Sequence, residues 1–250
     1  MITVKGIHKK FIKKIEKDSR EFFAVDNISF EAKEGEIYGV LGQNGAGKTT
    51  LLRMISGIME PTKGKILIDD LNYKDNNEKI KEKIAYLSGN TKLYANITPK
   101  ELLQIFANIY NIPKKEIKGR IEEVIKLLKL EEFANNKIGN LSTGQTQRVN
   151  LARCFIHNPK YYILDEATSG LDVMSSQIII DFIKEEKKNG KTVIYSTHYM
   201  EEAENICDRV LIIDHGKHII EDTPKNIMKT TKTNNLRDAF ISVLGGKDEN

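Results

Sequence analysis

The sequence predicts an α/β fold with a mostly parallel core sheet, and three observations lead to this prediction. First, short apolar segments typical of buried strands alternate along the chain with segments of helical periodicity. Second, the 250 residues are 40% hydrophobic and 30% charged, which suits a buried core beneath a solvated surface. Third, the chain contains neither an internal repeat nor a low-complexity segment, so a repeat architecture is not expected.

The first part of the chain contains three strand signals and one helix signal. Residues 28–32 alternate apolar and polar side chains, as an antiparallel strand with one solvated face does. Residues 36–41 form a buried-strand pattern that ends in glycine, and residues 65–68 predict another short strand. Residues 48–58 predict a helix. A strand, a glycine-rich turn and a helix therefore follow one another.

The middle of the chain is predicted to be helical. The segment Thr98-Pro-Lys-Glu101 has the form of a capping box with proline at the first helical position, which predicts a helix start. Further helices are expected over about residues 116–130 and 143–155, because apolar side chains recur there at helical spacing. We expect these helices to form a subdomain over about residues 90–158, inserted into the α/β core.

The last part of the chain returns to strand patterns separated by helices. Buried strands are expected at three places: residues 161–164, 192–195 and 210–213. We expect a single domain over residues 1–230, followed by a short helical tail over residues 231–250.

Composition excludes several classes of protein. The 39 Lys and Arg against 35 Asp and Glu give a net charge of +4, too mild to argue for a nucleic-acid partner. No apolar run exceeds four residues, whereas a membrane-spanning helix needs about 20. The N-terminus lacks the apolar segment of a secretory signal. Cys154 and Cys207 are isolated, which fits a reducing, cytoplasmic setting better than a disulfide or zinc framework.

The strongest chemical signal is the segment from Gly42 to Thr49, Gly-Gln-Asn-Gly-Ala-Gly-Lys-Thr. It matches a phosphate-binding loop and lies between a predicted strand and a predicted helix, as that loop requires. The glycines let consecutive backbone N–H groups curl around phosphate oxygens, and the helix N-terminus adds partial positive charge. Lys48 would reach the β- and γ-phosphates, and the Thr49 hydroxyl would bind Mg²⁺.

Two further signals lie downstream. Asp165 and Glu166 follow a buried strand, where Asp165 would face a metal and Glu166 could orient or deprotonate an attacking water. The segment Leu141-Ser-Thr-Gly-Gln145 precedes a predicted helix, whose N-terminus is another anion site. On its own, Ser142 would be an ordinary N-cap residue.

These motifs, together with Ser169-Gly-Leu-Asp172 and a lone His198 after a strand, occur in an order and at a spacing that resemble the nucleotide-binding subunit of an ATP-binding cassette (ABC) transporter. The resemblance covers about residues 2–228. It implies the cassette fold of P-loop NTPases, in which an antiparallel β subdomain and a helical subdomain are attached to a RecA-like core. It also implies an enzyme that hydrolyses ATP to ADP and phosphate with Mg²⁺.

The resemblance assigns roles to matching positions. Glu166 would be the catalytic base, Lys48 would act on the phosphates, and His198 would contact the γ-phosphate and sense its loss. Thr49 and Asp165 would hold Mg²⁺. The other phosphate-loop positions that would bind nucleotide are Gly42, Asn44, Gly45, Ala46, Gly47 and Thr50.

The resemblance also implies contacts to the base and to a second protomer. Phe11 falls where an aromatic residue stacks on adenine, and Phe23 is the alternative because the lysine-rich residues 13–20 leave the local alignment open. The family works as a head-to-tail dimer, here expected to be a homodimer. The residues that would close over ATP bound to the other protomer are Ser142, Gly144 and Gln145, with Asp172 at the seam.

Three positions depart from the family pattern. Gly89 stands where a glutamine usually couples the nucleotide to the membrane partner, and Asn90, Ser88 or water could replace its metal contact. Thr143 replaces a usual glycine and Ala167 replaces a usual proline. Neither of the last two changes is expected to abolish hydrolysis.

The segment from Ser88 to Tyr94 and the Ser-Thr-Gly signature resemble the NatA-type subgroup of exporters. Its members are ATPase subunits of sodium-extruding exporters and pair with a separate membrane subunit, NatB. We therefore expect a peripheral protein on the cytoplasmic face of the cell membrane that docks on a NatB-like permease and powers export, with Na⁺ as the candidate cargo.

Three alternatives stay open at this point. The cargo could be a drug or a peptide, or the chain could be a regulatory module that hydrolyses ATP poorly, which Gly89 would favour. It could also be a translation or DNA-repair relative. Those relatives usually carry two cassettes or a long coiled coil, whereas here only about 90 residues without sustained heptads separate Lys48 from Ser142.

Overall fold

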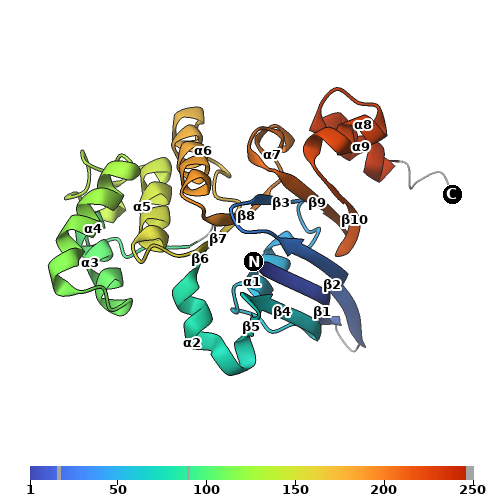
Figure 1. Cartoon of the computed structure of the whole chain (residues 1–250), viewed down its shortest axis with the longest axis horizontal. Coiled ribbons are helices and arrows are strands. Elements are labelled where there is room, and N and C mark those ends of the chain that lie inside the picture. The colour runs from blue at the N-terminus through green and yellow to red at the C-terminus, as the bar shows by residue number, and fades with distance from the viewer. Residues whose placement is uncertain (16–17, 89–90, 246–250) are drawn as a thin grey trace.

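The chain folds around two β-sheets that pack against each other, with helices on the remaining faces (Figure 1). The structure is a computed structural model that describes residues 1–15, 18–88 and 91–245, with the side chains of all of these except residues 13–20. Within this part of the chain, no helix has the length and apolarity needed to cross a membrane.

A six-stranded sheet forms the centre of the molecule, in the order β10-β9-β3-β8-β7-β6. Its strands are β3 (Ile37–Leu41), β6 (Ile84–Ser88), β7 (Tyr161–Asp165), β8 (Thr192–Thr197), β9 (Arg209–Asp214) and β10 (Lys217–Asp222). Neighbouring strands are parallel, apart from β10, which pairs antiparallel with β9 at one edge. Every residue of β3, β7 and β8 is buried, which explains why these strands are continuous apolar runs.

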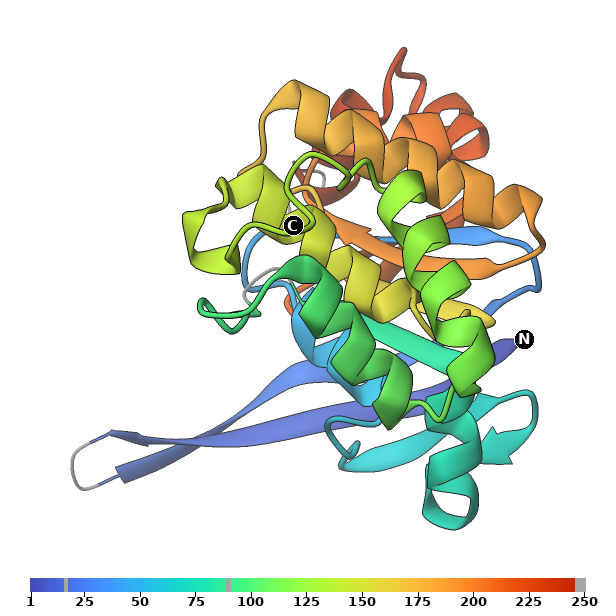
Figure 2. The ribbon, with the colours of Figure 1, turned by 90° about the vertical axis from the view of Figure 1, so that its left-hand side faces the viewer.

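A four-stranded antiparallel sheet packs beside this core, in the order β2-β1-β4-β5. Its strands are β1 (Ile2–Ile15), β2 (Asp18–Ala32), β4 (Lys63–Ile68) and β5 (Leu71–Asn72). The distal parts of β1 and β2 pair only with each other and project from the body as a long arm (Figure 2). The strand predicted over residues 28–32 is therefore the last part of a much longer one.

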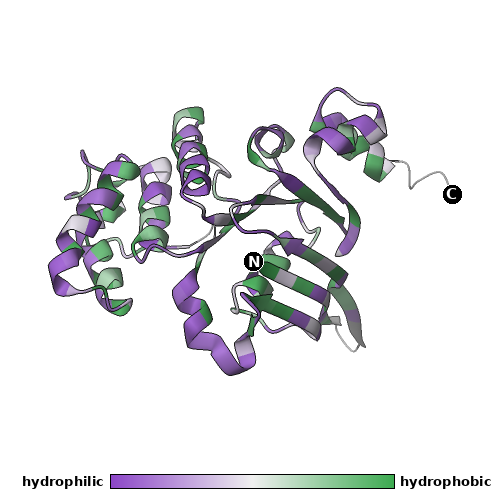
Figure 3. Ribbon diagram, in the orientation of Figure 1, coloured by the Kyte–Doolittle hydropathy of each residue, from purple (hydrophilic) through white to green (hydrophobic). Residues whose placement is uncertain are grey.

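Nine α-helices and one 3₁₀ helix complete the described part of the chain. Their bounds are α1 (Lys48–Ile55), α2 (Tyr73–Lys83), α3 (Pro99–Ile109), α4 (Lys114–Leu127), η1 (Ile138–Asn140), α5 (Thr143–Phe155), α6 (Val173–Lys188), α7 (Met200–Ile206), α8 (Pro224–Thr231) and α9 (Leu236–Gly245). The predicted capping box at Thr98 is present, and α5 has the predicted bounds. Sequence periodicity missed α2, because Ile80 is its one buried residue and the helix is almost wholly hydrophilic (Figure 3).

The central sheet separates two hydrophobic cores, because successive side chains of a strand point to opposite faces. In β7, Tyr161 and Ile163 join the core formed with α1 and the antiparallel sheet, whereas Tyr162 and Leu164 join the core formed with α3 to α9. Both faces of the sheet are thus covered, and its polar chemistry is confined to the strand ends. Because β3, β7 and β8 are parallel, the loops that follow them all begin at the carboxyl ends of the strands, on the same side of the sheet.

Candidate nucleotide-binding and catalytic site

The loop between β3 and α1 has a backbone that only glycine permits. Gly45 and Gly47 adopt left-handed φ angles of 85° and 105°. A Cβ atom on Gly47 would lie 2.2 Å from the carbonyl oxygen of Ala24, so the close approach of the antiparallel sheet excludes any side chain there. Lys48 begins α1, is 4% exposed, and donates hydrogen bonds to the carbonyl oxygens of Gly42 at 2.9 Å and Gln43 at 3.1 Å.

Asp165, at the end of β7, accepts hydrogen bonds from side chains of three other elements. The hydroxyls of Thr49 and Ser196 donate to its Oδ1 at 3.2 Å and 2.8 Å, and the Tyr86 hydroxyl donates to Oδ2 at 3.4 Å. Burial, with the charge of Asp165, raises the pKa of Tyr86, which keeps this phenol protonated as a donor. The predicted pair of Thr49 and Asp165 is therefore brought together.

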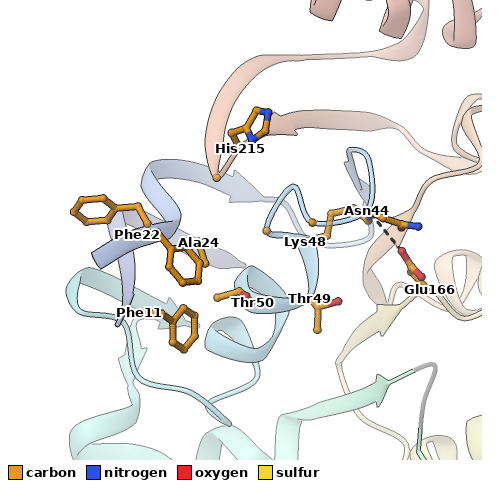
Figure 4. A pocket seen from close by; sticks show the side chains of 13 residues that line it. Phe11, Phe22, Ala24, Asn44, Lys48, Thr49, Thr50, Glu166 and His215 are labelled. Carbon is orange, nitrogen blue, oxygen red and sulfur yellow. Dashed lines mark ion pairs between the residues drawn. The ribbon is translucent and has the colours of Figure 1, made fainter. Parts of the chain in front are cut away.

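Glu166 forms a polar cluster with Lys48, Asp165 and His198. It has a left-handed φ of 50°. Its backbone N–H donates to both the carbonyl oxygen and the hydroxyl of Ser196, each at 3.1 Å, which holds this uncommon conformation. Its Oε1 lies 3.3 Å from Lys48 Nζ (Figure 4) and 3.4 Å from His198 Nδ1. One carboxylate oxygen thus faces both a buried cation and the imidazole.

A cavity of 610 Å³ extends from this polar cluster to an aromatic group on the arm (Figure 4). Its polar end includes Lys48, Thr49 and Glu166. Its lining is completed by Phe11, Phe22, Phe23, Ala24, Asn44, Gly45, Gly47, Thr50, His215 and Gly216. The Phe11 and Phe22 ring centroids are 5.9 Å apart. A space with donors at one end and exposed aromatic faces at the other suits a phosphorylated nucleotide.

Sequence reasoning missed several residues of this site. Phe22 and His215 line the cavity, and Ser196 and Tyr86 hold Asp165. The register of the sheet decides the position of Ser196, which pairs directly with Asp165. A motif search could not find it, since nothing in its own segment marks it as polar chemistry.

Some predicted residues lie outside the cavity. Gly42 and Ala46 belong to the loop but do not line the cavity. Asp165 and His198 do not line it either, although His198 lies within 3.4 Å of Glu166, which does. Gly89 and Asn90, on which the question of the missing glutamine depends, are outside the described residues. Ser88 is described and pairs with Asp165 at the end of β6.

A second group of predicted residues, Ser142, Gly144, Gln145 and Asp172, gathers away from the cavity. Ser142 caps α5 through a capping box with Gln145, at 3.2 Å and 2.9 Å. A Cβ on Gly144 would lie 2.2 Å from the Ser175 hydroxyl, so the starts of α5 and α6 pack tightly. Hydrogen bonds from the Ser175 backbone and hydroxyl lower the pKa of Asp172. Ser142 and Asp172 are exposed and Gln145 is half-buried around the buried Gly144, and none of the four lines the cavity of the same chain.

The donors at the polar end fit a hard divalent cation. Among the described residues, no group of three or more His, Cys, Asp or Glu side chains is placed to hold a metal. Thr49 and Asp165 nevertheless offer a hydroxyl and a carboxylate oxygen 3.2 Å apart. Oxygen ligands of this kind suit Mg²⁺, which usually keeps several waters and binds phosphates of the substrate.

Comparison with known proteins identifies the class to which this site belongs. Residues 25–169 match the family model of the ABC transporter. The chain is 37% identical to the ABC transporter ATP-binding protein NatA of Bacillus subtilis, over 98% of both chains. It is 38% identical to the linearmycin resistance ATP-binding protein LnrL of the same organism, over 81% of this chain and 65% of that one.

Solved structures agree with these sequence matches. The structure of an ATP-binding subunit of an ABC transporter has a TM-score of 0.84 and 26% identity, over 97% of this chain and 99% of the other. The cassette MJ0796, solved as a dimer in a post-hydrolysis state with ADP and phosphate, has a TM-score of 0.80 and 30% identity, over 89% and 98%. The chain belongs to the ABC transporter family, whose ATP-binding subunits bind and hydrolyse ATP.

Proposed function

We propose that this chain is the ATPase subunit of an exporter and that its cavity holds ATP with the phosphates on the loop between β3 and α1. Phe11 stacks on the adenine, and Lys48 binds the β- and γ-phosphates. Thr49 and Asp165 would hold Mg²⁺, which would neutralise charge on the β- and γ-phosphates. The cavity, with aromatic rings at one end and Lys48 and Thr49 at the other, supports this placement.

In this proposal, Glu166 is the general base. The observation that carries it is that one oxygen of Glu166 lies 3.3 Å from Lys48 Nζ and 3.4 Å from His198 Nδ1. Phosphate oxygens compete for Lys48 when ATP binds, because they carry more charge than one carboxylate. Glu166 is then free to accept a proton from water, while His198 keeps it oriented and contacts the γ-phosphate.

The second group of predicted residues, Ser142, Gly144, Gln145 and Asp172, closes over ATP bound to another copy of the chain. Two observations support this. Ser142, Gln145 and Asp172 lie apart from the cavity of their own chain and are at least partly exposed, at the positive end of the α5 dipole. The similar cassette MJ0796 was solved as a dimer. The two copies form a homodimer with an ATP molecule in each shared site.

The working partner is a membrane-embedded permease of the NatB type, and the cargo is Na⁺. The similarity to NatA over 98% of both chains supports this partner. The ATPase subunit accordingly sits on the cytoplasmic face of the membrane. Relatives named for linearmycin resistance and Nod factor export make other cargoes the alternative.

The catalytic part of the proposal is tested by Glu166→Gln. This change keeps the shape of the side chain but removes the proton acceptor, so we expect ATP hydrolysis to fall by at least about 100-fold, as loss of a general base does. ATP affinity should be retained, and an ATP-bound dimer should accumulate on size-exclusion chromatography. Phosphate release at the wild-type rate would show that Glu166 is not the base.

The transport part is tested by co-purification from gently solubilised membranes of the native cell. We expect a polytopic membrane protein to accompany the tagged chain, and the reconstituted pair to extrude Na⁺ from vesicles on addition of ATP. Efflux of another cargo would correct the substrate only. Recovery with ribosomes or DNA and without a membrane protein would refute the transporter role and leave the ATPase intact.

A further inference from the structure

The carboxylate of Glu202 accepts hydrogen bonds from three hydroxyl groups, which lie close in sequence to Glu166 and His198. Its Oε2 accepts hydrogen bonds from the Tyr195 hydroxyl at 2.5 Å, the Thr168 hydroxyl at 2.8 Å and the Thr197 hydroxyl at 3.4 Å. The hydroxyls of Thr168 and Tyr195 are also 2.9 Å apart. All three donor residues are at most 2% exposed, whereas Glu202 is half-buried, so the hydroxyls have little access to water and depend on this carboxylate.

The three donors lie next to Glu166 and His198 in the sequence: one is in the loop after β7, and two are at the end of β8, just before the loop that carries His198. Thr168 lies two residues after Glu166, in the turn that follows β7. Tyr195 and Thr197 are in β8, and Thr197 immediately precedes His198. The Thr197 hydroxyl also accepts from the backbone N–H of Tyr199, on the other side of the histidine, at 2.9 Å. The hydrogen bonds to Glu202 Oε2 therefore connect the loop that carries Glu166 and the loop that carries His198 to the same side chain.

The position of Glu202 is fixed by the packing of α7. Glu202 lies in the first turn of α7, whose Met200, Ala203 and Ile206 are buried in the core. A negative charge in the first turn of a helix is favourable, since free backbone N–H groups face it there. A short helix held by its apolar face thus provides a rigid support, from which the carboxylate reaches the two loops.

We propose that Glu202 is a positioning residue for ATP hydrolysis: it sets the distance between Glu166 and His198 by tying the turn at Thr168 to the end of β8. The inference rests on the proposed roles of Glu166 and His198. Neither Glu202 nor its three donors lines the nucleotide cavity, so the carboxylate acts through the loops rather than on the nucleotide. A misplacement of about 1 Å in a reacting group can cost about 100-fold in rate.

The test compares Glu202→Ala with Glu202→Gln in the full chain. Alanine removes the acceptor, and we expect kcat to fall between about 10-fold and 100-fold while the KM for ATP stays within about twofold. Glutamine keeps an acceptor oxygen at the same place and should restore most of kcat. Glu201→Ala is the matched control, because Glu201 is exposed in the same first turn of α7 and should leave kcat unchanged.

A double variant separates positioning from a merely structural role. If Glu202 acts through His198 and Glu166, the loss in Glu202→Ala/His198→Ala is smaller than the product of the two single losses. A fully multiplicative loss would overturn the inference, as would a wild-type kcat in Glu202→Ala. If Glu202→Ala does not fold, Thr168→Val is used instead. It removes the hydrogen bond from Thr168 to Glu202 and keeps the shape of the side chain at position 168. Lowered kcat at constant KM is then the expected result, and unchanged kcat the contrary one.

The outcome is distinguishable from failure of the proposed function. If Glu166→Gln hydrolyses ATP at the wild-type rate, the assignment of the base is wrong. If Glu166→Gln is inactive while Glu202→Ala turns over like the wild type, only the role of Glu202 is refuted.

Discussion

At the scale of single residues, the environments of two adjacent carboxylates separate their chemistry. Asp165 is 4% exposed and receives hydroxyl groups from three elements, so its oxygens are fixed in place. Glu166 retains 27% of its side-chain exposure and faces Lys48 and His198. The first environment suits an immobile ligand and the second a group that accepts a proton, which supports the proposed division of roles.

A titratable residue away from the site links stability to pH. Burial lowers the pKa of His157 to about 4, although Nε2 lies 3.1 Å from the carbonyl oxygen of Ile84. Its ring stacks on Tyr110 with centroids 3.7 Å apart, and its Nδ1 has no partner among the described residues. The residue is therefore neutral in the fold and has no second acceptor that would favour its cation.

We expect His157 to make the fold less stable as pH falls. Because the unfolded chain takes up this proton near pH 6.5 and the folded chain only near pH 4, the free energy of unfolding falls by up to about 1.4 kcal/mol per pH unit between these values. Urea titrations at several pH values should show a shallower decline for His157→Gln than for the wild type. The same slope in both proteins would contradict this, and exposed His218→Gln serves as the control.

At the scale of the elements, two glycines differ in whether the structure has room for a side chain at their positions. Gly119 lies in the interior of α4, is exposed, and a Cβ atom there would meet nothing within 4 Å. Gly57, after α1, has a φ of 71°, and a Cβ there would lie 2.3 Å from the Tyr73 ring. The first glycine only weakens its helix, whereas the second makes room for a neighbour.

Gly119→Ala should raise the free energy of unfolding by about 1 kcal/mol, because alanine favours the helix by about that amount without a clash. Chemical denaturation at neutral pH measures the change. Gly57→Ala is the opposite control and should destabilise, since both its φ and Tyr73 oppose a side chain. A destabilised Gly119→Ala would mean that α4 is held by a contact which that glycine permits.

At the scale of the whole molecule, the cavity proposed to hold the nucleotide spans the junction of the two sheets. Phe11 comes from the antiparallel sheet, whereas Lys48 and Glu166 follow strands of the central sheet. Gly47 also meets the carbonyl oxygen of Ala24 across this junction. A ligand that contacts both ends should therefore stabilise the packing of one sheet on the other.

Phe11→Ala should weaken ATP binding about 5-fold to 100-fold, which corresponds to the stacking energy of one base on an aromatic ring. The ATP-induced rise in Tm should shrink accordingly, because ligand stabilisation follows the ratio of concentration to Kd. Phe23→Ala is the informative comparison, since Phe23 also lines the cavity but is 45% exposed. A larger loss in Phe23→Ala would assign the base to that ring instead.

The sequence by itself determined the strand, loop and helix around residues 37–55, the capped starts of α3 and α5, and the buried strands β3, β7, β8 and β9. In each of these, the signal is local: a glycine that must have positive φ, a serine or threonine that caps a helix, or an apolar run. The family followed from the order of such local signals. For the same reason, the polar helix α2 was not predicted, and neither were the strands β1, β6 and β10 or the part of β2 before residue 28.

Only the tertiary structure decided which side chains meet. The register of β7 with β8 places Ser196 beside Asp165, and the common edge of parallel strands brings Lys48, Glu166 and His198 together. The hydrogen bonds from Thr168, Tyr195 and Thr197 to Glu202 likewise depend on the pairing of β7 with β8 and on the packing of α7. These contacts join segments that are far apart in the sequence, and strand order and register fix them. No local pattern contains that information, because the same apolar strands could pair in another order.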